Sequence, residues 1–126
     1  EVSPLRSRKS VGKEHTFATD ERDPEIVLGR LDSLITEVLA RLNDLDVAGR
    51  LAEVKIRYQG FETHTHGRSI PVAMDDEGVF HRLGHDLFAH HLDFSRPVRL
   101  IGFRIGQLEE PPNRQSTLGR YSGDLL

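Results

Sequence analysis

A stripe of apolar residues at helical spacing, preceded by a strong helix-start signal, is the feature that most constrains the fold. The stripe recurs in steps of three and four residues and consists of Leu28, Leu31, Ile35, Val38, Leu42 and Leu45. It follows Asp23-Pro24, where the aspartate can cap the first turn and proline suits the first helical position. The pattern predicts an amphipathic helix that ends near Ala48-Gly49 and buries one face. Gly29, inside this helix, is expected to mark close packing against the sheet.

A second helical pattern begins at the acidic run Asp75-Asp76-Glu77 and carries Phe80, Leu83, Leu87, Phe88 and Leu92. The segments around these helices are typical of strands. Residues 52–58 alternate between apolar and charged side chains, which predicts a half-buried strand. Further strands are expected over residues 9–19, over residues 61–70 with an end at Pro71, and from Pro97 onward.

The resulting element order, βαββαβ, predicts an α+β fold. Two amphipathic helices need an apolar surface to cover, and a four-stranded, mainly antiparallel sheet with both helices packed on one face provides it. The opposite face of the sheet would then be open. We place a linker at residues 1–8, this domain at residues 9–108 and a flexible tail at residues 109–126.

The first strand is rich in groups that bind phosphate. Arg8, Lys9, Ser10, Gly12, Lys13 and Thr16 lie within a short stretch. Cations, hydroxyls and a glycine that permits close approach are the donors that a nucleic-acid backbone requires. A second interpretation stays open, in which this is an exposed edge strand protected from aggregation by its lysines.

The net charge of −3 argues against nucleic-acid binding until it is divided along the chain. Residues 1–19, 50–70 and 96–106, which are mostly predicted strand, hold eleven basic and four acidic residues, a net charge of +7. The remaining residues carry −10. This division predicts a basic sheet backed by acidic helices. The alternative, that helices merely carry solvating acids, explains the negative part only.

Two sequence motifs extend this argument: K-S-x-G-K-E-x-T-F from Lys9 and P-V-R-L-x-G-x-R from Pro97. In this order and at this spacing they resemble the little-finger domain of Y-family translesion DNA polymerases, most closely the DNA polymerase IV group. The resemblance covers roughly residues 8–118. It implies a C-terminal domain that grips primer–template DNA across the major groove through its phosphates, as part of a DNA-directed DNA polymerase.

The resemblance and the residues together give a set of candidate DNA contacts. They are Arg8, Lys9, Ser10, Gly12, Lys13, Thr16, Lys55, Arg57, Arg68, Arg99 and Arg104. Lys55 and Arg57 are equally well explained as solvated residues. Arg99 and Arg104 fall on opposite faces of a regular strand, so both reach DNA only if a bulge near Gly102 intervenes or if Arg99 lies beyond the helix layer. We favour Arg104. Backbone contacts predict sequence-tolerant, salt-sensitive binding.

The tail contains a Q-x-x-L motif, formed by Gln115 and Leu118, with Tyr121 three residues further on. It resembles the sliding-clamp motif of bacterial polymerase IV, in which glutamine binds at the mouth of a pocket and leucine fills it. Gly119 stands where a large apolar residue is usual. Gln115, Leu118 and Tyr121 alternatively resemble the archaeal and eukaryotic clamp pattern Q-x-x-L-x-x-Y. A tail without a partner is the other interpretation.

Catalytic residues are not expected in this chain, because the metal-binding palm carboxylates of the polymerase are absent. Mg²⁺ is expected only at the palm of the parent enzyme. His81 and His85 lie one helical turn apart but lack the glutamate of a zinc-protease helix, so we predict no metal site. The absence of cysteines and of long apolar runs indicates a cytoplasmic protein that does not enter membranes.

Two rival functions remain. A stand-alone RNA-recognition fold would need stacking aromatics on its central strands, and the charged face of residues 52–58 has none. A clamp-adaptor domain would bind the clamp and have no affinity for DNA.

Overall fold

The computed structural model describes residues 10–110. Within them the chain forms, in order, β1 (Ser10–Glu21), α2 (Pro24–Leu45), β2 (Ala48–Tyr58), β3 (Thr63–Met74), α3 (Glu77–His91) and β4 (Val98–Glu109). The predicted βαββαβ order is therefore confirmed. The last strand extends one residue beyond the predicted domain boundary at 108.

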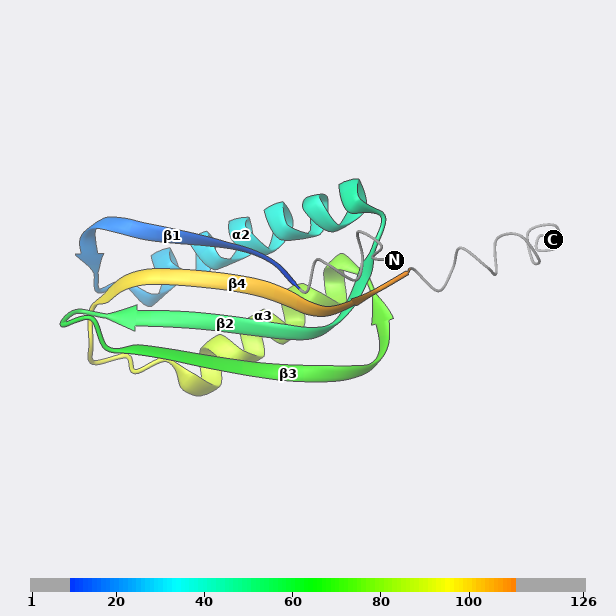
Figure 1. Cartoon of the computed structure of the whole chain (residues 1–126). Coiled ribbons are helices and arrows are strands. Elements are labelled where there is room, and N and C mark those ends of the chain that lie inside the picture. Colours follow the sequence, from blue (N-terminus) through cyan, green and yellow to red (C-terminus); the bar gives the residue numbers. More distant parts are fainter. Residues whose placement is uncertain (1–9, 111–126) are drawn as a thin grey trace, which may run out of the picture.

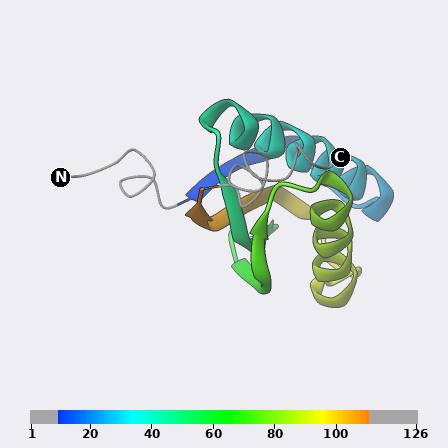
Figure 2. The same cartoon turned by 90° about the vertical axis from the view of Figure 1, so that its right-hand side faces the viewer.

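The strands form a four-stranded sheet in the order β1-β4-β2-β3, with every neighbouring pair antiparallel. Both helices pack on the same face of this sheet (Figures 1 and 2). Helix α2 contacts β1 and β4, whereas α3 contacts β2 and β3. The other face is not covered by any element of the described chain, and this uncovered side is called the open face below.

Local signals explain where each helix begins and ends. Asp23 caps α2 by accepting a hydrogen bond from the backbone N–H of Glu25 at 2.9 Å, and Pro24 is the first helical residue. Asp76 caps α3 in the same way, through the N–H of Val79. The predicted end of the first helix at Ala48-Gly49 is wrong. The helix stops at Leu45 because Asp46 adopts a left-handed conformation, and β2 has begun by Ala48.

Strand β3 also differs from its predicted bounds. It does not end at Pro71 but continues to Met74. A proline is tolerated there because β3 is an edge strand and its register against β2 shifts between Gly49 and Leu51. Arg50 stabilises this irregular stretch by donating from Nε to the carbonyl of Ile70 at 3.3 Å.

The core lies between the sheet and the helices. Its fully buried side chains include Phe80, Phe103, Ile35, Ile56 and Ile101. The close approach expected at Gly29 is not found, since that glycine is exposed and an added Cβ would meet nothing within 4 Å. Gly84 of α3 is the tightly packed helical glycine instead, because a Cβ there would lie 2.7 Å from Cδ1 of Ile35 on α2.

Candidate nucleic-acid interface

Antiparallel register brings small, hydroxyl-bearing and charged residues together on the open face. Cross-strand partners point to the same side of a sheet, so each row can be followed from β1 across β4 and β2 to β3. Four rows result: Ser10, Gly106, Leu51 and Ser69; Gly12, Arg104, Glu53 and Gly67; Glu14, Gly102, Lys55 and Thr65; Thr16, Leu100, Arg57 and Thr63. Of the predicted contacts, Ser10, Gly12, Thr16, Lys55, Arg57 and Arg104 lie in these rows.

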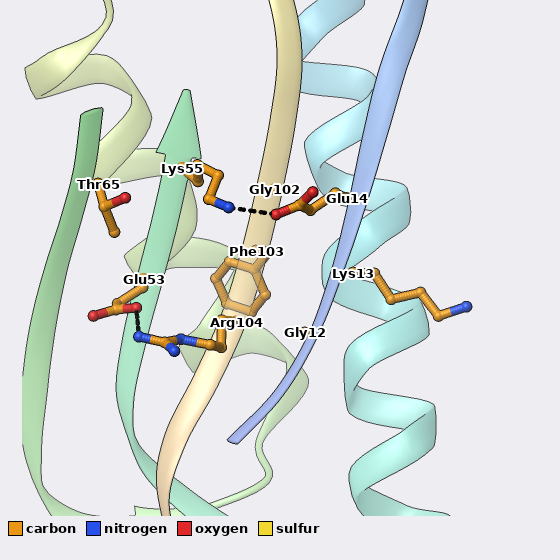
Figure 3. Close-up of a pocket in the computed structure, with 9 residues that line it drawn as sticks. All are labelled: Gly12, Lys13, Glu14, Glu53, Lys55, Thr65, Gly102, Phe103 and Arg104. Carbon is orange, nitrogen blue, oxygen red and sulfur yellow. Dashed lines mark hydrogen bonds and ion pairs between the residues drawn. The ribbon is translucent and has the colours of Figure 1, made fainter. Parts of the chain in front are cut away.

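Two ion pairs cross the centre of the open face (Figure 3). Nζ of Lys55 lies 2.5 Å from Oε2 of Glu14, and the guanidinium of Arg104 donates to the carboxylate of Glu53. Arg57 donates from Nε to the hydroxyl of Thr63 at 2.8 Å. These contacts give each cation of the open face a partner on the sheet, and the side chains of Lys55 and Arg104 remain partly exposed.

Glycines leave the middle of this face without side chains of its own, so that the surface is hollowed there. Gly102 stands between Glu14 and Lys55, and a Cβ there would lie 3.1 Å from Cγ of Glu14. A Cβ at Gly12 would similarly lie 3.2 Å from Cβ of Arg104. The two glycines therefore leave space for the flanking side chains to fold over them. A hollow of about 550 Å³ results, with the side chains of Lys55 and Arg104 at its sides (Figure 3).

Lys13 does not join the open face. Its cross-strand partner is the buried Phe103, and its Nζ lies 3.5 Å from Oε1 of Glu37 on α2. Figure 3 shows its side chain extending beyond β1, away from the paired Lys55 and Glu14. Val11 is two residues from Lys13, on the same face of the strand, and it is buried. This apolar residue was the available sequence signal for the orientation of Lys13. Both side chains of the pair with Glu37 are about half exposed, so the pair is weak and the lysine can leave it.

Arg68 is also on the helix side of the sheet. It pairs in register with buried Ala52, and its Nη1 lies 3.9 Å from Oδ2 of Asp86 on α3. Its strand, β3, forms one edge of the sheet, and β1, the strand of Lys13, forms the other. The predicted roles of Lys13 and Arg68 in DNA binding stay predictions, and they are confined to the two edges.

Arg99 occupies an irregular position. Residues 57 and 58 of β2 pair with Leu100 and Val98, so Arg99 is an extra residue in β4. The irregularity lies here and not near Gly102, which pairs regularly on both sides. The Arg99 guanidinium lies over the ring of Phe61 at 4.6 Å from its centroid, and its Nε lies 3.4 Å from Oδ1 of Asp20. Arg104 lies in a regular row of the open face and Arg99 does not, and the roles of both in DNA binding stay predictions.

Charge on the open face is more balanced than the sequence indicated. Its rows contain Lys55, Arg57 and Arg104 but also Glu14 and Glu53. These two acids are visible in the sequence, but their pairing with Lys55 and Arg104 follows only from the register of the sheet. Arg8, Lys9, Gln115, Leu118 and Tyr121, which were also predicted to bind DNA or the clamp, lie outside the described residues.

Neither α2 nor α3, the helices of the described stretch, has the length and apolar character required to traverse a bilayer.

Solved structures with the same arrangement define the class of domain. The chain resembles the little finger domain of PolIV in a complex with the beta-clamp processivity factor, with a TM-score of 0.64, 22% identity and coverage of 79% of this chain and 89% of that one. A Y-family DNA polymerase chimera of Dbh and Dpo4 gives a TM-score of 0.63 at 22% identity, over 82% of this chain and 29% of the chimera. These likenesses establish a little-finger fold.

Sequence comparison gives the family. The model of the impB/mucB/samB family C-terminal domain matches residues 8–118, and the chain belongs to this family. It is 35% identical over 121 residues to DNA polymerase IV of Methanoculleus marisnigri, covering 96% of this chain and 33% of that protein. It is 36% identical over 118 residues to DNA polymerase IV of Staphylococcus aureus, covering 94% and 33%. The chain thus spans about a third of the length of these curated relatives. The resemblance to the little-finger domain of Y-family polymerases, inferred from the two sequence motifs, is confirmed.

Proposed function

We propose that this domain grips duplex DNA with the open face and the two edge strands of its sheet, as the little finger of a translesion DNA polymerase. The observation that carries the proposal is the open face itself. Cations, hydroxyls and glycines from all four strands lie there side by side, uncovered by any described element. Membership of a family whose relatives include DNA polymerase IV supports the same function.

The dimensions of the sheet suit a duplex. Neighbouring strands are spaced ~4.8 Å apart, so β1 and β3 are separated by ~14 Å across β4 and β2. The major groove of B-form DNA is ~12 Å wide. With β4 and β2 facing the groove, the edge strands would lie along the phosphates on either side. Lys13 on β1 and Arg68 on β3 would then reach these phosphates from the edges.

The composition of the open face favours backbone binding over base stacking. Its rows contain no aromatic residue among the described positions, and the apolar members are Leu51 and Leu100. Proteins that recognise single-stranded RNA on a sheet stack bases on aromatic side chains. We therefore expect binding that depends on phosphates and tolerates any sequence.

For the parent protein we propose the activity of a DNA-directed DNA polymerase that acts on damaged templates. Divalent metal ions at its palm would support nucleotide transfer, and the domain described above would supply affinity for the primer–template. The proposal includes a second partner. Gln115, Leu118 and Tyr121 would anchor a sliding clamp and thereby raise the local concentration of the enzyme at the primer end. The similar little finger domain that was solved in complex with a beta-clamp supports this part.

Fluorescence anisotropy tests DNA binding directly. The chain is titrated with labelled primer–template DNA of two unrelated sequences at several salt concentrations. We expect equal affinity for both sequences and, if five phosphates are neutralised, a fall in log K of roughly 4–5 per tenfold rise in salt. Replacing Lys13, Lys55 and Arg68 together with alanine should abolish binding at moderate salt.

A matched variant, in which the exposed helix residues Arg30, Arg41 and Arg82 become alanine, removes the same charge and should keep most of the affinity. Equal losses in the two variants would contradict a specific interface. A chain truncated after Glu110 separates DNA grip from a clamp adaptor. The truncated chain should still bind DNA, whereas absence of DNA binding in the full chain, even at low salt, would favour the adaptor.

A further inference from the structure

Three potential metal ligands converge where α2 and α3 meet. Oδ1 of Asp32 on α2 lies 2.8 Å from Nδ1 of His81 and 2.6 Å from Nε2 of His85, both on α3. The three ligand atoms all lie within 4.8 Å of one another. The sequence showed the spacing of His81 and His85 but not their shared partner Asp32, and on that spacing alone no metal site was predicted.

Packing between the helices holds this cluster together. His81 and His85 occupy one face of α3 because they are one turn apart. Gly84, beside His85, lets the backbone of α3 approach α2, since a Cβ at that position would lie 2.7 Å from Ile35. Ile35 is fully buried and is three residues from Asp32, on the same side of α2. The positions of the three ligands are therefore set by the core and not by mobile loops.

The far side of the His81 ring is also engaged. Its Nε2 lies 3.3 Å from Oγ1 of Thr36 and 3.7 Å from Oε2 of Glu77. A histidine that binds a metal through one ring nitrogen almost always donates the other N–H to an oxygen, which fixes the ring and its tautomer. Thr36 and Glu77 offer that second interaction when Nδ1 of His81 serves as the ligand. A carboxylate that only accepts hydrogen bonds from two imidazoles does not require this second interaction at Nε2 of His81.

We propose that Asp32, His81 and His85 form a binding site for a divalent transition-metal ion, with Zn²⁺ as the best-suited ion, that links α2 to α3. A tetrahedral Zn²⁺ with bonds of ~2.1 Å needs ligand atoms ~3.4 Å apart. The two oxygen–nitrogen distances at the site are 2.8 and 2.6 Å, so each of them must lengthen by less than ~1 Å to admit the ion. The side chains are partly exposed, which leaves the fourth position to water.

The ligand set selects the kind of ion. Two imidazoles and one carboxylate suit zinc and its neighbours in the first transition row, whereas Mg²⁺ and Ca²⁺ prefer sites made of oxygen atoms.

The site is on the helix layer, on the far side of the sheet from the open face. Metal binding and DNA binding are therefore expected to be independent. A result that contradicts one of these two proposals does not contradict the other. Bound metal would join the two helices and stabilise the folded domain, because the unfolded chain does not hold the ligands in place.

Isothermal titration calorimetry of the 126-residue chain with ZnCl₂, and separately with MgCl₂, tests the proposal. We expect one strong, saturable Zn²⁺ site per chain and no response to Mg²⁺. Thermal unfolding should shift to higher temperature with Zn²⁺. At a free concentration of about 100 times Kd, the folding equilibrium constant rises about 100-fold. Absence of a saturable Zn²⁺ site would overturn the proposal.

Variants then locate the ion. Asp32→Asn and His85→Gln should abolish the strong site, and Thr36→Val, which removes no ligand, should weaken it about 10-fold. His66 and His91 stack with ring centroids 3.7 Å apart and are the competing place for an ion. A double His66→Gln and His91→Gln variant should therefore bind normally. Loss of the site in this double variant, with retention in His85→Gln, would contradict the assignment. Circular dichroism without metal confirms that each variant is folded.

Discussion

Lys55 and Glu14, on two strands that are not neighbours, meet over Gly102 with 2.5 Å between Nζ and Oε2. The pair spans β4 at a position without a side chain, and it neutralises a cation at the centre of the proposed DNA-binding face. A residue that repels phosphate thus lies beside one that attracts it.

Replacing this acid should strengthen DNA binding. In Glu14→Gln, Lys55 is free and one repelling charge is gone. Relief of ~1 kcal/mol of repulsion corresponds to about fivefold tighter binding at low salt. The slope of log K against log salt should become steeper by about 0.9 if Lys55 gains a phosphate. Anisotropy measures both. Asp44→Asn, an exposed change of the same charge on α2, is the control, and equal effects of the two variants would argue for net charge alone.

The edge cations should contribute to affinity and not to folding. Lys13→Ala removes only an exposed ion pair with Glu37, worth at most ~1 kcal/mol. Urea unfolding should change little, whereas the salt slope of DNA binding should become shallower by about 1. Glu37→Gln breaks the same pair and keeps the lysine. If that variant also lost affinity, the pair rather than the cation would be responsible.

Two glycine substitutions should have opposite effects on stability. Gly29 is exposed within α2, and a Cβ there meets nothing within 4 Å. Gly29→Ala should therefore stabilise the domain by ~1 kcal/mol through helix propensity. A Cβ at Gly49 would lie 2.3 Å from Cγ2 of Ile105 and 3.0 Å from the carbonyl of Gly106. Gly49→Ala should destabilise by ~1–3 kcal/mol. Urea denaturation gives both values, and a shared sign would contradict the packing described above.

Mild acid should destabilise the domain through His66. Burial lowers the pKa of His66, and the neighbouring charges of His91 and His64 lower it further. The unfolded chain, with an ordinary value near 6.5, then binds the proton more readily than the folded chain. Stability should fall as the pH drops below about 6.5 and stop falling once the folded-state pKa is passed. His66→Gln should flatten this part of a stability–pH curve, whereas His90→Gln should not.

Much of the fold was predictable because its local signals agree. The stripe from Leu28 to Leu45 and the caps at Asp23 and Asp76 located both helices, and the alternation around Val54 located a central strand. The path of β3 beyond Pro71 was not predictable. Its tolerance for proline depends on being at the sheet edge, and strand order is a long-range property.

The candidate sites were predictable only in part. The residue types at Lys55, Arg57 and Arg104 indicated a basic face. However, the pairing of two of these cations with Glu53 and Glu14 depends on register between strands far apart in the chain. Arg68 could not be oriented, because β3 lacks an apolar alternation that fixes its faces. The spacing of His81 and His85 was visible, but Asp32 joins them only when α2 packs on α3.

The central position of β4, the last strand of the described chain, has a consequence for synthesis. It pairs with both β1 and β2. During translation the edges of β1 and β2 that will contact β4 therefore stay unpaired until residues 98–109 have left the ribosome. Exposed strand edges promote aggregation, and long-range pairing slows folding. A premature stop before Val98 would thus leave more than a shortened domain: it would leave two separate pieces of sheet, β1 alone and the hairpin of β2 with β3, each ready to pair with other chains.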